Sequence, residues 1–506
     1  MVTSEKFGIQ GSSLQVADVV TGGLLLLSLV IRLALLIGPV GSDDLNYFHY
    51  AQKLLHWDEF SELHHHGGRL VFLAIIGLPA AAVGSIFAGA VANVLMLSAR
   101  DIFVVWYLRK RCGAVAAASG AGILGFNALS TTYAGVMLPD GLLSWCMFMS
   151  AVCAYESIQA FSRKRFLLVI AGGVLAGAAY SVKDTGILIV PSAIAWIVLA
   201  DNRWKKVPGR SLGEAGLYLG AFALFVLLEM SVYYALSGDA LYRIHAISLT
   251  HNTTGDVVAV SSLYDFARST YWNAFAVTRW SAASLPVLLV AGVVWSASIL
   301  RRTRFAFFSL TGVFLTFYLI FGSSSLTRAI PLPVQDRYFE IIVPFLAVAA
   351  AGWMGHYAKQ ASHRALSLVC AILLPVLLAL LSVPAIVVNA GDLTFSSLGK
   401  NAAIAIGAVR HAEPNRPVHV SPRMYRVLEL FIAEDIRKEL VVIPDAGPLP
   451  AGFYILHPWL DTLTKYQRTE DIADLRTYIA VDEDHRIFQQ LAPTKLKREI
   501  VVKYVE

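Results

Sequence analysis

Residues 19–48 read VVTGGLLLLSLVIRLALLIGPVGSDDLNYF, an apolar run followed at once by the acidic pair Asp43 and Asp44. A helix of about 20 apolar residues crosses the roughly 30 Å of hydrocarbon in a bilayer. The first 17 residues of the chain carry one cationic side chain, and no small-residue cleavage site follows the run. These features predict a retained first membrane span rather than a removable signal sequence.

The composition excludes an ordinary soluble protein. Of the 506 residues, 57% are hydrophobic and 15% are charged, and the mean hydropathy is +0.61. The net charge of +6 comes from short Lys and Arg clusters between apolar segments, so we exclude a nucleic-acid-binding face. The cysteines lie in apolar runs or beside a basic patch, which supports neither a disulfide framework nor a zinc site. They are Cys112, Cys146, Cys153 and Cys370.

Ten more apolar stretches are long enough to be membrane helices. They lie near residues 84–108, 113–132, 139–160, 166–181, 186–200, 213–236, 282–300, 305–322, 339–357 and 366–388. The sequence therefore predicts a polytopic α-helical membrane protein with about eleven spans. Residues 70–83 form a further apolar piece, which we interpret as a re-entrant or interfacial helix.

Clusters of Lys and Arg mark every second loop, which is the positive-inside alternation. The clusters lie within residues 109–111, 163–165, 203–210, 301–304 and 359–364. This phase predicts a cytoplasmic N-terminus. The loops expected on the outer side are 41–83, 133–138, 182–185, 237–281 and 323–338, and the tail after 389 is expected there too.

Residues 389–506 differ from the rest of the chain. Helical patterns near 399–411 and 422–438 alternate with short β-rich runs. The runs are Val418 to Val420, Leu440 to Ile443, Phe453 to Leu456 and Ile500 to Val505. We therefore expect a membrane domain in 1–388 and an extracytoplasmic soluble α/β domain in 389–506.

The acidic pair opens the first outer loop. Ser42 precedes an amphipathic run to Trp57, which predicts a helix at the membrane interface with Asp43 and Asp44 in its first turn. There the carboxylates stabilise the helix dipole, by about 0.3–1 kcal/mol. Alternatively, they act as a general base with its orienting partner, or hold a divalent cation.

The same loop ends with His64, His65 and His66, followed by Gly67 and Gly68. Three histidines suggest a metal site. Consecutive residues do not converge easily on one ion, however, and no other His or Cys cluster supports the interpretation. We leave the metal unassigned.

Three cations lie where outward loops meet apolar segments. Arg69 closes the first loop, Lys183 lies in the turn Ser181 to Gly186, and Arg337 precedes the tenth span. A guanidinium at headgroup depth binds phosphate in a bidentate fashion. Alternatively, Arg69 extends to the interface without a ligand, and Lys183 is neutralised by its neighbour Asp184.

Ionisable side chains also lie inside predicted spans. They are Arg32 in the first, Arg100 and Asp101 in the second and Glu229 in the seventh. An intramembrane charge costs at least about 2.5 kcal/mol, so each is a candidate functional group. For Arg100 and Asp101 we favour pairing between helices.

Taken in order, these motifs resemble the GT-C superfamily of membrane glycosyltransferases. The branch is that of the protein O-mannosyltransferases and lipid A aminoarabinose transferases, and the resemblance covers residues 18 to about 360. The segments that carry it are the acidic pair, Arg69, Leu138-Pro139-Asp140, Ser181-Val182-Lys183-Asp184-Thr185-Gly186 and Asp336-Arg337-Tyr338 with Pro344. One departure is that Gly67-Gly68 replaces the two prolines of the family's His-Pro-Pro or Lys-Pro-Pro sequence, which leaves the geometry of this loop open.

The resemblance implies an inverting transfer from a polyprenyl-phosphate sugar donor to a hydroxyl of a glycan, lipid or protein. It implies Asp43 as the catalytic carboxylate with Asp44 beside it, and Arg69, Lys183 and Arg337 as cations on the donor phosphate. Further candidates for substrate binding are His65, His66, Asp140 and Tyr338. No cofactor is expected with certainty, and a divalent cation stays open. The implied location is the bacterial inner membrane.

Two other classes of function stay open. A secondary transporter has a similar number of spans and buried charges, but it favours repeated halves, and no repeat is visible here. A non-catalytic lipid-binding or envelope assembly protein keeps the cations and tolerates loss of Asp43.

Overall fold

A computed structural model describes most of the chain. The described residues are 5–36, 38, 43–60, 63–199, 208–253, 284–300, 305–322, 336–358, 372–383, 386, 398–428, 431–443, 451–456 and 501–505. The chain divides into two compact units. The membrane unit comprises residues 1–38 and 46–389, and the C-terminal unit comprises 390–506 together with the short segment 39–45. The acidic pair therefore groups with the C-terminal unit, whereas the sequence placed it within the membrane domain.

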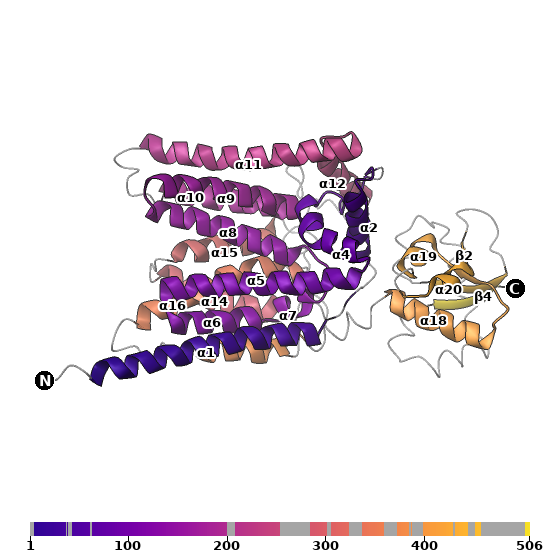
Figure 1. The fold of residues 1–506 in the computed structure, drawn as a ribbon, viewed down its shortest axis with the longest axis horizontal. Coiled ribbons are helices and arrows are strands. Elements are labelled where there is room, and N and C mark those ends of the chain that lie inside the picture. The colour runs from indigo at the N-terminus through magenta and orange to yellow at the C-terminus, as the bar shows by residue number, and fades with distance from the viewer. Residues whose placement is uncertain are drawn as a thin grey trace. The chain divides into compact units, whose positions relative to one another are not determined.

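The described part of the membrane unit is helical, with its long helices side by side (Figure 1). The elements up to the turn after α9 are α1 (Glu5–Ala34), α2 (Asp43–His56), α3 (Leu70–Phe72), the π-helical η1 (Leu73–Gly77), α4 (Leu78–Val83), α5 (Ile86–Cys112), α6 (Ala114–Gly125), α7 (Ala128–Ala134), α8 (Asp140–Gln159), α9 (Ser162–Val182) and the 3₁₀ helix η2 (Asp184–Leu188). The later ones are α10 (Ile189–Leu199), α11 (Pro208–Ser237), α12 (Tyr242–Thr253), α14 (Ser284–Leu300), α15 (Ala306–Phe321), the 3₁₀ helix η4 (Asp336–Ile342) and α16 (Val343–Ala358). A further apolar helix covers Ile372–Val383.

Among the described residues, six helices are long and apolar enough to cross a membrane. The bent pair α6 and α7, at 54° to each other, makes a seventh if it forms one span. Four further stretches predicted as spans are helical but shorter: Asp184–Leu199, Val287–Leu300, Ala306–Phe321 and Ile372–Val383. The polytopic helical class is thus confirmed, but the count of about eleven spans is not. The apolar piece 70–83 is a helix with one π turn.

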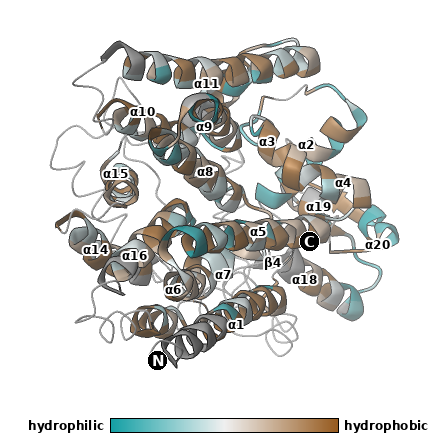
Figure 2. Ribbon diagram, turned by 60° about the vertical axis from the view of Figure 1, so that its left-hand side comes forward, coloured by the Kyte–Doolittle hydropathy of each residue, from teal (hydrophilic) through white to brown (hydrophobic). Residues whose placement is uncertain are grey.

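Burial separates a central layer of helices from an outer layer. The span window of α8 is 78% buried and that of residues 337–354 is 83% buried, whereas those of α1 and α11 are 17% buried. Leucine and valine side chains are exposed on these outer helices, for example Val19 at 76% and Leu228 at 59%. Figure 2 shows predominantly apolar colouring along α1 and α11. An exposed apolar surface of this kind fits the hydrocarbon of a membrane.

Arg32, Arg100 and Asp101, three of the ionisable side chains inside the predicted spans, form one buried network with Glu340. Arg100 on α5 donates to Asp101 at 2.9 Å and pairs with Glu340 of η4. Arg32 on α1 donates to the other oxygen of Asp101 at 2.7 Å. Two cations and two carboxylates balance, which is the condition under which charges are tolerated in a low-dielectric interior. The pairing between helices expected for Arg100 and Asp101 is confirmed, and Arg32 joins it.

The C-terminal unit is an α/β structure. Its described helices are α18 (Leu398–Ala412), α19 (Pro422–Leu428) and α20 (Glu434–Lys438), and its strands are β1 (Val418–Val420), β2 (Leu440–Val442), β3 (Gly452–Leu456) and β4 (Val501–Val505). The strand order is β2-β1-β3-β4, parallel except for the antiparallel β4. Apolar residues of α18, α19 and the strands form its core, including Ile406, Val420 and Ile455. The predicted α/β character and all four predicted strands are confirmed.

Candidate functional site

Two of the predicted phosphate-binding cations meet at one carboxylate. Lys183 Nζ lies 2.7 Å from Oδ1 of Asp140, and Arg337 Nε lies 3.6 Å from Oδ2 of the same side chain. The first distance is a charged hydrogen bond, and the second is an ion pair too long for one. Tyr338 closes the group, because Lys183 Nζ lies 3.4 Å from the centre of its ring. We call these four residues the cation cluster.

The ends of three helices position the cation cluster. Asp140 is the first residue of α8, Lys183 follows the last residue of α9, and Arg337 lies in the first turn of η4. The turn after α9 is tight because the Gly186 N–H donates to the Lys183 carbonyl at 2.8 Å. A side chain at Gly186 would collide with the Ala179 carbonyl, so the sequence needs glycine there. Three loops that the basic clusters placed on the outer side therefore meet in space.

Arg243 on α12 holds the turn that carries Lys183. Its Nη2 donates to Asp184 Oδ1 at 2.7 Å, its Nη1 lies 3.3 Å from Glu229, and it also bonds the Tyr180 carbonyl. Burial lowers the pKa of Arg243, but the charges of Asp184 and Glu229 outweigh this effect and raise it above its ordinary value. Arg243 therefore stays charged. Asp184 pairs with Arg243, so the alternative that it neutralises Lys183 is wrong.

The end of the first loop packs against the same turn. The Val71 N–H donates to Ser181 Oγ at 3.2 Å. A side chain at Gly68 would lie 3.3 Å from Cγ of Arg243. Arg69, between these two contacts, has its guanidinium carbon 5.3 Å from the centre of the Tyr47 ring. Arg69 thus lies in a segment bound to the turn that carries Lys183, and a shared phosphate for all three cations stays a prediction.

Position 67 has a steric reason to be glycine. The Gly67 N–H donates to the His64 carbonyl at 3.0 Å, which closes a turn over the three histidines. A side chain on Gly67 would lie 2.6 Å from Tyr242 Oη and 2.7 Å from the Tyr50 ring. His66 is buried, and His65 is half-buried. In the described part of the chain, this turn is the one place where three or more metal-ligating side chains gather.

Asp43 and Asp44 are the first two residues of α2, as predicted from the cap and the amphipathic run. Asp44 is 1% exposed, and Asp43 is half-buried. Both belong to the segment that groups with the C-terminal unit, where the next residue, Leu45, packs against the apolar core. Their catalytic role stays a prediction.

Sequence reasoning missed Arg243 and the role of Glu340. Arg243 lies in the predicted outer loop 237–281, to which no motif was assigned. Its position directly after Tyr242 in a short helix is what distinguishes it from other loop cations. Glu340 lies inside the predicted span 339–357. An ionisable side chain inside a span was the available signal.

No protein-family model matches the chain, and no curated protein sequence matches it. Solved structures do. ArnT from Cupriavidus metallidurans, solved bound to undecaprenyl phosphate, has a TM-score of 0.50 and 12% identity, and the match covers 87% of this chain and 93% of ArnT. ArnT is a GT-C superfamily membrane glycosyltransferase. This chain shares the GT-C fold.

Two larger proteins of the same superfamily also match. AglB, the oligosaccharyltransferase of Archaeoglobus fulgidus solved with an inhibitory peptide and a dolichol-phosphate, has a TM-score of 0.47 and 12% identity over 85% of this chain. The arabinosyltransferase EmbB from Mycobacterium smegmatis has a TM-score of 0.42 and 13% identity over 78% of this chain. The chain spans 61% of the length of AglB and 41% of the length of EmbB. The match to ArnT, with its TM-score of 0.50, confirms at the level of the fold the resemblance inferred from the motifs.

Proposed function

We propose that this protein is an inverting glycosyltransferase that moves a sugar from a polyprenyl-phosphate donor to a hydroxyl acceptor. The acceptor is a glycolipid, a cell-envelope polysaccharide or a protein on the extracytoplasmic side of a bacterial inner membrane. The observation that carries the proposal is the cation cluster, where Lys183 and Arg337 converge from loops far apart in the sequence. The GT-C fold supports it, because ArnT with the same fold was solved with undecaprenyl phosphate bound.

The cations suit a leaving phosphate. As the bond between the anomeric carbon and the phosphate oxygen breaks, its electron pair moves to that oxygen and negative charge grows there. Fixed cations at that point stabilise the transition state more than the ground state. Among the four residues of the cluster, Lys183 and Arg337 carry positive charges and Asp140 carries a negative one, so their formal charges sum to a positive value, the sign that suits an anionic ligand.

The acceptor hydroxyl needs a base on the opposite face of the sugar. We assign this role to Asp43, with Asp44 as its partner, since a carboxylate within hydrogen-bond reach of the hydroxyl accepts its proton. The acceptor oxygen then bonds to the anomeric carbon from the side opposite the phosphate. The configuration at that carbon inverts.

Binding of undecaprenyl phosphate to the detergent-purified full chain tests the phosphate site without knowledge of the sugar. Lys183→Ala and Arg337→Ala should each weaken binding by about 10- to 100-fold, because a charged hydrogen bond contributes about 1.5–3 kcal/mol. Matched controls are Lys110→Ala and Arg109→Ala. Both residues lie in the last turn of α5, in the basic cluster that is predicted to be cytoplasmic. Unchanged affinity for undecaprenyl phosphate in both the Lys183→Ala and the Arg337→Ala variant would contradict the proposed phosphate site.

Turnover tests the base. Asp43→Asn should keep undecaprenyl phosphate binding and lose about 100- to 10,000-fold in sugar transfer, the size of a general-base effect. If Asp44→Asn abolishes transfer and Asp43→Asn does not, the two roles are exchanged. Binding without transfer from any lipid-phosphate sugar would indicate a lipid-binding protein, and substrate movement across liposomes would indicate a transporter. Mass spectrometry of envelope glycans from a deletion strain would identify the sugar and the acceptor.

A further inference from the structure

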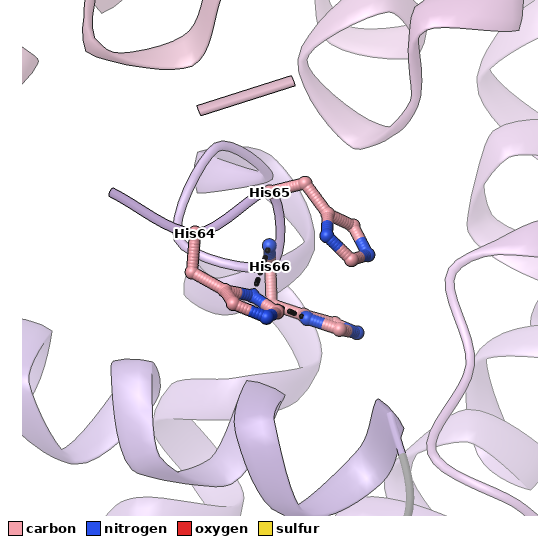
Figure 3. Close-up of side chains that lie close together, drawn as sticks. All are labelled: His64, His65 and His66. Atoms are coloured by element: carbon pink, nitrogen blue, oxygen red, sulfur yellow. Dashed lines mark hydrogen bonds between the residues drawn. The ribbon is translucent and has the colours of Figure 1, made fainter. Parts of the chain in front are cut away.

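The three consecutive histidines of the first outer loop lie with their rings together. The ring centres of His64 and His66 are 4.6 Å apart, and those of His65 and His66 are 3.9 Å apart. Nδ1 of His64 lies 2.8 Å from Nδ1 of His66. Figure 3 shows these two rings joined by that contact, with the His65 ring on the adjacent side. One ring nitrogen from each residue can be chosen so that all three lie within 4.8 Å of one another.

The turn explains how consecutive residues converge. The bond from Gly67 N–H to the His64 carbonyl folds the chain back on itself, so that His65 and His66 occupy its two central positions. Tyr50 stacks on His64 at 6.4 Å, and Tyr242 Oη accepts from the His64 N–H at 3.4 Å. Aromatic packing against Gly67 leaves the turn little room to change. The expectation that adjacent histidines do not converge is wrong for this turn.

We propose that His64, His65 and His66 bind one divalent transition metal ion of the zinc class and leave a fourth position for a non-protein ligand. Three imidazoles with an open position are a known zinc donor set, with bonds of about 2.0–2.1 Å. Tetrahedral bonds of that length separate the donor nitrogens by about 3.4 Å. The present separations bracket this value, from 2.8 Å for the hydrogen-bonded pair to at most 4.8 Å. Small ring movements, with loss of that hydrogen bond, complete the site.

The surroundings select the class of metal. The three ligands that the turn supplies are imidazoles, and imidazole suits zinc, copper and nickel rather than magnesium or calcium. His66 packs edge-on against Tyr47 at 4.6 Å, and Arg69 lies over the same Tyr47 ring at 5.3 Å. An imidazole donor set of this kind favours ions that make strong bonds to nitrogen.

Cobalt titration tests the site directly. The full chain is purified in detergent without a polyhistidine tag, stripped with a chelator and titrated with Co²⁺, whose visible absorption reports tetrahedral nitrogen ligation. We expect one Co²⁺ per chain, displaced by Zn²⁺ and not by Mg²⁺. His65→Ala and His66→Ala should each weaken Co²⁺ binding by at least about tenfold, and the triple alanine variant should not bind. The matched control is His56→Ala, an exposed histidine on α2 outside the turn, which should bind as the unsubstituted chain does.

Two results would overturn the proposal. One is no saturable Co²⁺ absorption in the unsubstituted chain, a result that does not depend on whether any variant folds. The other is unchanged stoichiometry and affinity in the triple variant, which would place the bound ion elsewhere. Neither result uses sugar transfer, so failure of the metal site is distinguishable from failure of the glycosyltransferase proposal.

Discussion

Asp140 links two cations that come from different loops. Lys183 is 10% exposed and Asp140 is 6% exposed, so the pair is largely shielded from water. Asp140→Ala would leave Lys183 and Arg337 facing each other without their shared carboxylate. Removing one partner of a buried pair costs about 3–5 kcal/mol, because the other charge stays uncompensated. We expect a clear fall in the thermal unfolding temperature of the detergent-purified protein.

The double variant separates charge from packing. Lys183→Met keeps most of the side-chain volume of Lys183 and removes its charge. Combined with Asp140→Ala, it should lose less stability than the sum of the two single variants, since residues in direct contact are not additive. Strictly additive losses would mean that the 2.7 Å ion pair contributes nothing.

At the scale of elements, η4 joins the cation cluster to the buried network. Arg337 faces Asp140, and three residues later Glu340 binds Arg100, which also donates to Ser144 at 3.0 Å. Asp140 and Ser144 lie one turn apart on α8, so η4 follows the first turn of that helix. The 3₁₀ period of three places both η4 side chains on one face.

Glu340→Gln should therefore destabilise the membrane unit. The network would keep Arg32 and Arg100 with Asp101 alone, which leaves one net positive charge buried. We expect a loss of about 3–5 kcal/mol, measured as thermal or denaturant unfolding. The control is Glu156→Gln near the end of α8, where Glu156 is 14% exposed and bonds Tyr107 and Arg111. Equal losses of stability in the two variants would show that the Arg100 network contributes no more to stability than the ion pair of Glu156.

The sequence predicted the positions of individual helices better than the pairing of side chains between them. Apolar runs and turn residues located the helices around Asp140 and Lys183, because length and hydropathy are local properties. The pairing of Lys183 with Asp140 rather than with Asp184 depends on α8 and α9 lying side by side, which no local pattern encodes. The expectation that His64, His65 and His66 do not converge was wrong for the same reason. Their convergence depends on Tyr50 and Tyr242, which pack against Gly67 from two other helices.

At the scale of the whole molecule, the sidedness of the chain depends on how many helices cross the membrane. An odd number places the two termini on opposite sides, and an even number places them on the same side. The six long helices alone give an even number of crossings, and the six together with the bent pair give an odd number. The meeting of Asp140, Lys183 and Arg337 puts the start of α8, the end of α9 and the start of η4 at one end of the bundle, as the alternation of basic loops predicts.

We expect all eleven helices to cross, with the tail outside. The 16 residues of α15 rise about 24 Å, some 6 Å less than an average hydrocarbon core. Such a mismatch costs fractions of a kcal/mol per Å, and local thinning of the bilayer or a flanking turn accommodates it. The 3₁₀ helix η2 is such a flanking turn, since it directly precedes α10 and lengthens it. Alkaline phosphatase fused after Glu506 should then be active and green fluorescent protein at the same place dark. Fusions after Lys206, in a basic loop, should give the opposite pattern. Fluorescence at Glu506 together with fluorescence at Lys206 would require an even number of crossings and would put the C-terminal unit on the cytoplasmic side.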